Sequence, residues 1–281
     1  MKENVLVILG NGFDIDLGWK TSFVDICRSK VFIDGMRHYQ YDYLSELQDK
    51  EYWCDLELYL RDMIINQHNN PNQEPLKFWL TSFWKTYEYL YPSKADLNTY
   101  VTNKKSCAFR FLNHISKARI ISFNYTNPFS FLGLKEHEIL HIHGDLENAN
   151  TITLGVDKTI EDYVQNIEDY SRLLKTYNND NVERFISAVK ESATIIIYGH
   201  SLGITDSDYF KPMFELLNTG NSPKKLFLIT KNGVGWQQMK KNMLSYGIDF
   251  SKIICTNNSI EIIYTKDDAS DSKFNELLKL I

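Results

Sequence analysis

The chain of 281 residues lacks several features that mark particular classes of protein. Acidic residues outnumber basic ones, 36 to 31, and the net charge of -5 argues against a protein that mainly wraps nucleic acid. The four cysteines form no C-x-x-C pair and no secretory leader is evident, so we expect reduced thiols in a cytoplasmic protein. No apolar run approaches the roughly 20 residues of a membrane-spanning helix, and we therefore expect no membrane association.

Histidine is missing from the place where a serine hydrolase would need it. The stretch TIIIYGHSLG, residues 194–203, ends in the G-x-S-x-G pattern that exposes the nucleophile of α/β-hydrolases. Their triad requires a histidine later in the chain than the serine. No histidine follows Ser201, and no HGGG-type oxyanion motif is present. The sequence therefore disfavours an esterase, and the strand followed by a glycine turn needs another purpose.

Short apolar runs rich in β-branched residues recur along the chain and predict a sheet. They are VLVILG at residues 5–10 and the segments 118–124, 138–144, 151–156, 194–199, 225–230, 252–256 and 260–265. Continuous apolar runs of this kind are typical of strands buried on both faces of a parallel sheet. Helical patterns such as NVERFISAVKES separate several of them. The alternation predicts an α/β protein with a doubly wound, mostly parallel, Rossmann-like sheet.

Residues 27–116 differ in character from the rest of the chain. Tyr, Trp and Phe crowd together there, with apolar positions three and four apart, and the loop NQHNNPNQEP at residues 66–75 divides the region. This pattern predicts an aromatic-rich helical insertion within a single α/β domain that spans residues 1–281. We expect the aromatic residues to form core, or a lid that partly covers a site.

The candidate site residues are the polar residues at the predicted strand exits, because ligands of open α/β sheets bind beyond the carboxyl ends of the strands. The first exit is Gly10-Asn11-Gly12-Phe13-Asp14, where two glycines allow a tight turn and close approach to a phosphate. The G-x-G-x-x-G fingerprint is incomplete, since residue 15 is isoleucine. Nucleotide binding and a plain tight turn both stay open at this exit.

The next two exits carry Asn124, directly after a predicted strand, and the motif HIHGD, which contains His141 and His143. Asn124 suits either a catalytic role or a loop with good turn residues. His143 can project as a general base, with His141 structural. A zinc site that also includes His137 is the alternative.

The fourth exit is GHSLGITDSDYF, which begins at Gly199. Gly199, Ser201, Asp206 and Asp208 can line a nucleotide pocket without acyl chemistry, because serine and aspartate bond well to ribose hydroxyls. The two aspartates also suit the start of the helix that follows, as capping residues.

Taken in order, the motifs LGNGFDIDLGWKTSF, WCDLE, ISFNYTN, HIHGD and YGHSLGITDSDYF resemble the AbiH family of bacteriophage abortive-infection proteins. Their order is also distantly similar to that of sirtuin-type Rossmann domains. The second resemblance implies a domain that binds NAD or a related nucleotide and hydrolyses it. Asn124 would orient the ribose or water, and His143 would be the base. The nucleotide-binding residues would be Gly10, Asn11, Gly12, Phe13, Asp14, Gly199, Ser201 and Asp208.

Departures from the sirtuin pattern limit what that resemblance implies. Asn11, Asp14 and Thr126 stand where sirtuins usually have alanine, serine and aspartate. The four-cysteine zinc module of the deacetylases is missing as well, so protein deacetylation is not expected and no metal is assigned. Hydrolysis of NAD needs neither zinc nor an acyl-lysine channel.

The sequence thus predicts an abortive-infection effector that binds and hydrolyses NAD or a related nucleotide. The alternative is a non-catalytic nucleotide-binding sensor or partner-recruiting module. Metal-dependent cleavage of nucleic acid by paired acids (Asp14, Asp145, Asp206, Asp208) is a third reading, which the acidic chain without a basic track argues against. The expected partners are the nucleotide and a phage-derived trigger protein, and self-association stays open.

Overall fold

A computed structural model of the chain describes residues 4–22, 25, 57, 61–62, 64–66, 100–115, 117–135, 137–147, 151, 153, 155–164, 175, 179–219, 223–254, 258–266 and 271–281. The chain divides into two compact units. The first comprises Met1–Trp19, Val101–Ile152 and Asn178–Ile281, and the second comprises Lys20–Tyr100 and Thr153–Tyr177. Most of the predicted insertion at residues 27–116 lies outside the described residues.

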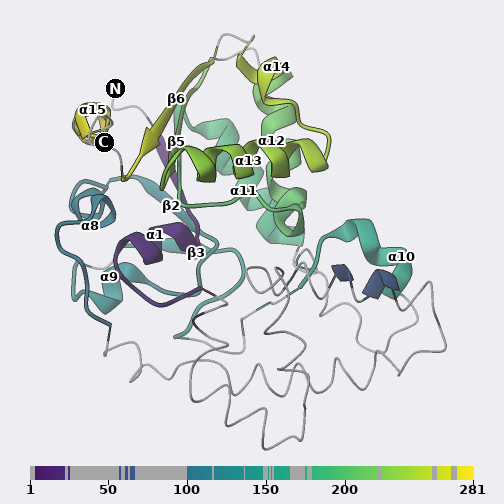
Figure 1. The fold of residues 1–281 in the computed structure, drawn as a ribbon, viewed down its shortest axis with the longest axis horizontal. Coiled ribbons are helices and arrows are strands. Elements are labelled where there is room, and N and C mark those ends of the chain that lie inside the picture. The colour runs from purple at the N-terminus through teal and green to yellow at the C-terminus, as the bar shows by residue number, and fades with distance from the viewer. Residues whose placement is uncertain are drawn as a thin grey trace, which may run out of the picture. The chain divides into compact units, whose positions relative to one another are not determined.

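The first unit contains a sheet of six parallel strands in the order β3-β2-β1-β4-β5-β6 (Figure 1). The strands are β1 (Val5–Leu9), β2 (Arg119–Ser122), β3 (Ile139–His141), β4 (Thr194–Tyr198), β5 (Lys225–Thr230) and β6 (Ser259–Tyr264). This is the strand order of the doubly wound dinucleotide-binding fold. The predicted α/β class, with a parallel Rossmann-like sheet, is confirmed.

Four helices cover one face of the sheet: α11 (Asn179–Glu191), α12 (Ser207–Thr219), α13 (Gly233–Ser245) and α14 (Phe250–Ile254). The residues of the sheet that alternate toward them, such as Leu6, Ile8 and Ile197, share one buried core cluster with side chains of these helices. Each fully buried aliphatic side chain of this kind contributes about 1.5–3 kcal/mol. The apolar runs of the sequence therefore supply the main stabilisation of the sheet.

The opposite face carries the helices α1 (Asn11–Asp16), α8 (Cys107–Leu112) and α15 (Asp271–Leu280). Tyr198 of β4 lies among them, with its ring 5.0 Å from that of Phe13 and 5.3 Å from that of Phe111, and Phe111 in turn contacts Phe274. The Tyr198 hydroxyl donates to Asp16 Oδ2, which also accepts from the backbone N–H of Ala108. Both faces of the sheet are thus covered, as a parallel sheet requires.

Short elements complete the first unit: α9 (Pro128–Phe131) after β2, and the 3₁₀ turn η6 (Ile204–Asp206) before α12. The second unit contains η3 (Lys158–Ile160) and α10 (Glu161–Val164). Two ion pairs with buried acceptors join segments of that unit that are far apart in sequence, Lys175 with Glu57 and Arg61 with Asp157. No described helix has both the length and the apolar character needed to span a bilayer.

Two of the predicted strands are wrong. Residues 252–256 begin within helix α14, because the Asp249 carboxylate accepts hydrogen bonds from the backbone N–H and hydroxyl of Ser251 and so starts a helix. Of residues 151–156, the described ones join no strand of the sheet, and only Val156 forms an isolated bridge. The chain then turns into η3, where Asp157 caps the backbone N–H of Thr159.

The exits of the two central strands are in direct backbone contact. The N–H of Gly10 donates to the carbonyl of Tyr198 at 2.9 Å, and the N–H of Gly12 donates to that of Gly199 at 2.8 Å. A Cβ at Gly12 would lie 2.7 Å from the Gly199 oxygen, and a Cβ at Gly199 would lie 2.3 Å from the Phe13 nitrogen. Gly199 also has a φ of 67°, which favours glycine. These two glycines let the strand exits meet.

We predict that Gly199→Ala lowers the free energy of unfolding by about 2–5 kcal/mol, because it adds both a clash and a strained backbone. Gly133→Ala is the matched control, since Gly133 has a φ of 61° but no atom within 4 Å of the added Cβ. It should cost only about 1–2 kcal/mol. Urea unfolding of the full chain measures both values, and equal losses would contradict the close approach as the cause.

Candidate functional site

The candidate site lies at the carboxyl edge of the sheet, where the strand order reverses between β1 and β4. Ligands of doubly wound sheets bind at this switch point. The N–H groups of Gly12 and Phe13, which could bind a phosphate, donate to the carbonyl oxygens of Gly199 and Gly10. The glycine turn therefore joins the two strand exits, and these two amides bind a phosphate only if those bonds open.

Asp14, Asn124 and Thr126 form a buried polar group beside this turn. The amide nitrogen of Asn124 donates to Asp14 Oδ1 at 3.0 Å, and the Thr126 hydroxyl donates to Asp14 Oδ2. Asp14 is 1% exposed. Burial raises the pKa of its carboxyl from 3.8 to about 7, although the hydrogen bonds from Thr126 and Asn124 act in the opposite direction. Near neutral pH this carboxyl therefore changes between its neutral and charged forms.

The orientation of the Asn124 side chain is fixed by these contacts. Its Nδ2 carries two hydrogens, and both are used: one bonds Asp14, and the other the Gly10 carbonyl at 3.1 Å. Its backbone is held by the Ser122 hydroxyl and by His141, whose Nδ1–H donates to the Asn124 carbonyl at 2.9 Å. Within the described part of the chain, Asn124 Oδ1 is a buried acceptor with no hydrogen-bond partner. Asn124 therefore offers a ligand an acceptor and not a donor.

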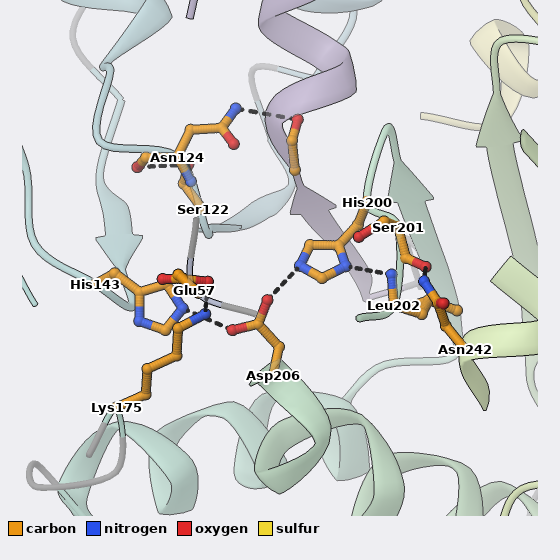
Figure 2. Close-up of polar contacts among 11 residues, drawn as sticks. Glu57, Ser122, Asn124, His143, Lys175, His200, Ser201, Leu202, Asp206 and Asn242 are labelled. Atoms are coloured by element: carbon orange, nitrogen blue, oxygen red, sulfur yellow. Dashed lines mark hydrogen bonds and ion pairs between the residues drawn. The ribbon is translucent and has the colours of Figure 1, made fainter. Parts of the chain in front are cut away.

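A second buried group consists of a carboxylate between two histidines (Figure 2). Asp206 Oδ1 lies 2.9 Å from Nε2 of His143, and its Oδ2 lies 3.3 Å from Nε2 of His200. The three residues are 9%, 3% and 6% exposed, respectively. Asp206 comes from η6, His143 follows β3, and His200 follows β4. Two strand exits, those after β3 and β4, thus supply one contiguous set of ionisable side chains.

The ring of Phe123 lies next to both histidines, with centroid distances of 5.3 Å to His143 and 4.6 Å to His200. Tyr209 and Phe210 of α12 add further aromatic contacts to the same rings. Both histidine rings are therefore packed against aromatic side chains, and because all three residues are buried, electrostatic interactions among them are stronger than in water. Since Phe123 precedes Asn124 directly, one short segment of chain contacts both polar groups.

The structure brings most of the predicted site residues to one edge of the sheet. Asn124 bonds both Gly10 and Asp14, and Gly12 and Gly199 join them through the glycine turn. His143 lies in the second polar group. The other predicted residues lie further along the exits: Asn11 and Phe13 in α1, the exposed Ser201 after β4, and the half-buried Asp208 in the first turn of α12.

The histidines of the alternative zinc site bond to three different partners. His137 Nδ1 contacts the carbonyl of Glu138, His141 bonds the Asn124 backbone, and His143 bonds Asp206. Burial also lowers the pKa of His141, consistent with a neutral ring that supports the backbone of Asn124. No group of three or more side chains suited to a metal ion occurs among the residues with described positions.

Sequence reasoning missed the roles of His200, Asp206 and Thr126. In the sequence His200 belongs only to the G-x-S-x-G motif, Asp206 suits a cap, a pocket or a pair of metal-binding acids, and Thr126 is a departure from sirtuins. The spacing of Asn124 and Thr126 is that of two side chains on one side of a strand, although residues 123–125 form a bend in the structure. The pairing of His143 with Asp206 spans 63 residues, and no local pattern indicates it.

A family model described as "Bacteriophage abortive infection AbiH" matches residues 6–228, which is most of the chain and includes all four strand exits. No curated protein matches the chain significantly.

We predict that Asp14→Asn stabilises the protein above pH 7. The folded-state pKa of about 7 exceeds the value of 3.8 expected when unfolded, so the wild type loses stability as pH rises from about 4 to 7. Three pKa units correspond to about 4 kcal/mol, and asparagine does not titrate. Unfolding free energies measured from pH 4 to pH 8 should show the advantage of the variant growing over this range. Parallel pH profiles of the two proteins would contradict the raised pKa.

Proposed function

This chain belongs to the AbiH family of bacteriophage abortive-infection proteins, and we propose that it acts by binding and hydrolysing NAD or a related nucleotide at the carboxyl edge of its sheet. Family membership assigns it to phage defence by abortive infection. The observation that carries the nucleotide proposal is the parallel sheet in the order β3-β2-β1-β4-β5-β6, with its polar residues gathered at the switch point where this fold takes nucleotides.

The proposed reaction breaks the bond between nicotinamide and ribose. Nicotinamide leaves with the bonding electron pair, an oxocarbenium-like centre forms at the ribose carbon, and a water oxygen bonds to that carbon. His143 accepts the proton that the water loses. The Asp14 carboxylate, or Asp208 in the first turn of α12, stabilises the positive charge that develops on the ribose.

Asn124 supports a nucleotide ligand through its unused acceptor. A buried acceptor without a partner costs about 1–3 kcal/mol, and a hydroxyl of the ribose or the attacking water supplies the donor that Oδ1 needs. Both hydrogens of its Nδ2 are held by Gly10 and Asp14, so the side chain keeps this orientation before the ligand binds. Pre-organisation of this kind favours binding and catalysis.

The second candidate function is a nucleotide-binding sensor that does not turn its ligand over. It is favoured by the burial of Asp14, Asn124 and His143 at 1%, 6% and 3% exposure, and by their bonds to other parts of the chain. A site closed in this way needs a trigger before a substrate enters it, and we infer that a phage-derived protein supplies that trigger. Nucleotide binding without release of nicotinamide would identify the sensor.

We predict that the purified chain releases nicotinamide from NAD in the presence of a lysate from phage-infected cells. Asn124→Ala and His143→Ala should each lower kcat by about 10²–10⁴-fold, which is the usual contribution of a positioned acid–base group. The matched control is His114→Ala, since His114 is exposed and contacts only the Arg110 carbonyl among the interactions described for it. It should keep wild-type activity.

The hydrolase proposal is contradicted if NAD stays intact with and without the lysate while Asn124→Ala keeps full phage resistance in cells. Intact NAD together with a loss of resistance in Asn124→Ala would instead favour the sensor. Plaque counts on cells that express each variant at equal levels provide the second readout.

A further inference from the structure

Two residues that the proposed reaction does not use link the side chain of His143 to the backbone of a neighbouring turn. They are Asp206 and His200, and the polar contacts drawn in Figure 2 run from His143 through Asp206 and His200 to the backbone N–H of Leu202. We propose that Asp206 and His200 are positioning residues, which together decide which nitrogen of His143 accepts a proton. This inference rests on the proposed function in that His143 is the base there.

The tautomer of His200 follows from its backbone contact. The N–H of Leu202 donates to Nδ1 of His200 at 2.9 Å, so Nδ1 carries a lone pair and the proton of the neutral ring is on Nε2. That nitrogen faces Asp206 Oδ2 at 3.3 Å, an electrostatic contact slightly longer than a typical hydrogen bond. Protonation of His200 at Nδ1 would place two N–H groups against each other. The Leu202 contact therefore holds His200 in the Nε2–H tautomer.

The tautomer of His143 follows from its contact with Asp206 in the same way. A carboxylate oxygen accepts and does not donate, so Nε2 of His143, 2.9 Å from Asp206 Oδ1, carries a proton. The basic nitrogen of the neutral ring is then Nδ1. When His143 takes a proton at Nδ1, the charge of Asp206 compensates the imidazolium, whose ring is buried and packed against Phe123 and Tyr209.

The turn that anchors His200 is held from both sides. The Asn242 side chain of α13 donates to the Ser201 carbonyl at 2.8 Å, and Leu202 bonds His200. Among the described residues, Leu202 is the only non-glycine residue with a positive φ, at 55°. Such a backbone is strained and persists where the surrounding contacts enforce it. The strain lies at the residue whose N–H fixes the tautomer of His200, which fits a positioning role.

The first test replaces the carboxylate by its amide. Asp206→Asn keeps the size of the side chain but offers one acceptor and one donor, so it cannot accept from both Nε2–H groups. We expect kcat for nicotinamide release to fall by about 10²–10⁴-fold with KM changed less than about threefold. The matched control is Asp180→Asn, an exposed carboxylate in the first turn of α11, which should match the wild type. A change in KM alone would overturn the positioning role.

The second test uses two variants of His200, each of which keeps one of its two contacts and loses the other. In His200→Gln the amide nitrogen can replace Nε2 as donor to Asp206, and in His200→Asn the amide oxygen can replace Nδ1 as acceptor for the Leu202 N–H. If His200 positions Asp206, the glutamine variant should retain at least about tenfold more kcat than the asparagine variant. Equal kcat values would mean that His200 only fills space, and would overturn its part of the proposal.

The third test does not depend on NAD. Nitrogen-15 NMR of histidine-labelled full chain reports which ring nitrogen is protonated, and His143→Gln and His200→Gln assign the two rings. We expect both rings as the Nε2–H tautomer in the wild type, and at least one changed in Asp206→Asn. If these tautomers are observed while NAD stays intact, the hydrolase proposal is refuted but the positioning role of Asp206 stands. Wild-type rings with Nδ1–H, or signals unchanged in Asp206→Asn, would overturn it.

Discussion

The close backbone contact between the exits of β1 and β4 is the constraint on which the rest of the site depends. The Gly12 N–H bonds the Gly199 carbonyl at 2.8 Å, and neither position leaves room for a Cβ. This contact fixes Gly10, whose carbonyl holds the Asn124 amide. It also fixes the start of the turn that carries His200. The two glycine motifs are therefore explained first by the packing of two strand exits and only then by a ligand.

The site contains two buried carboxyl groups, and their hydrogen-bonding surroundings differ. Asp14 is bonded by two neutral donors, the Asn124 amide and the Thr126 hydroxyl, and burial raises its pKa to about 7. Asp206 instead lies between two imidazole rings, those of His143 and His200. Pairs of ionisable groups in different environments are typical of sites that move protons. The arrangement supports a chemical role for this edge of the sheet.

Much of the fold could be predicted from the sequence, because strands buried on both faces must be apolar along their whole length. An apolar run wrongly predicted a strand at residues 252–256. There the Asp249 cap starts a helix in spite of two isoleucines. The positions of Asn124 and His143 could be predicted, because each lies two residues beyond the end of a strand, while their roles stay a prediction. The role of Asp206 could not, since its contact with His143 joins residues 63 positions apart and depends on how η6 is placed against the sheet.

The central claim is that a nucleotide binds at the carboxyl edge of this sheet with its reactive ribose beside Asn124 and His143. A crystal structure of the full chain with a non-cleavable NAD analogue tests it most directly. The account predicts a donor group of the analogue, or a water bound to it, about 3 Å from Asn124 Oδ1, and the reactive ribose carbon on the Nδ1 side of His143. An analogue bound away from these two residues, or none bound at millimolar concentration, would contradict it.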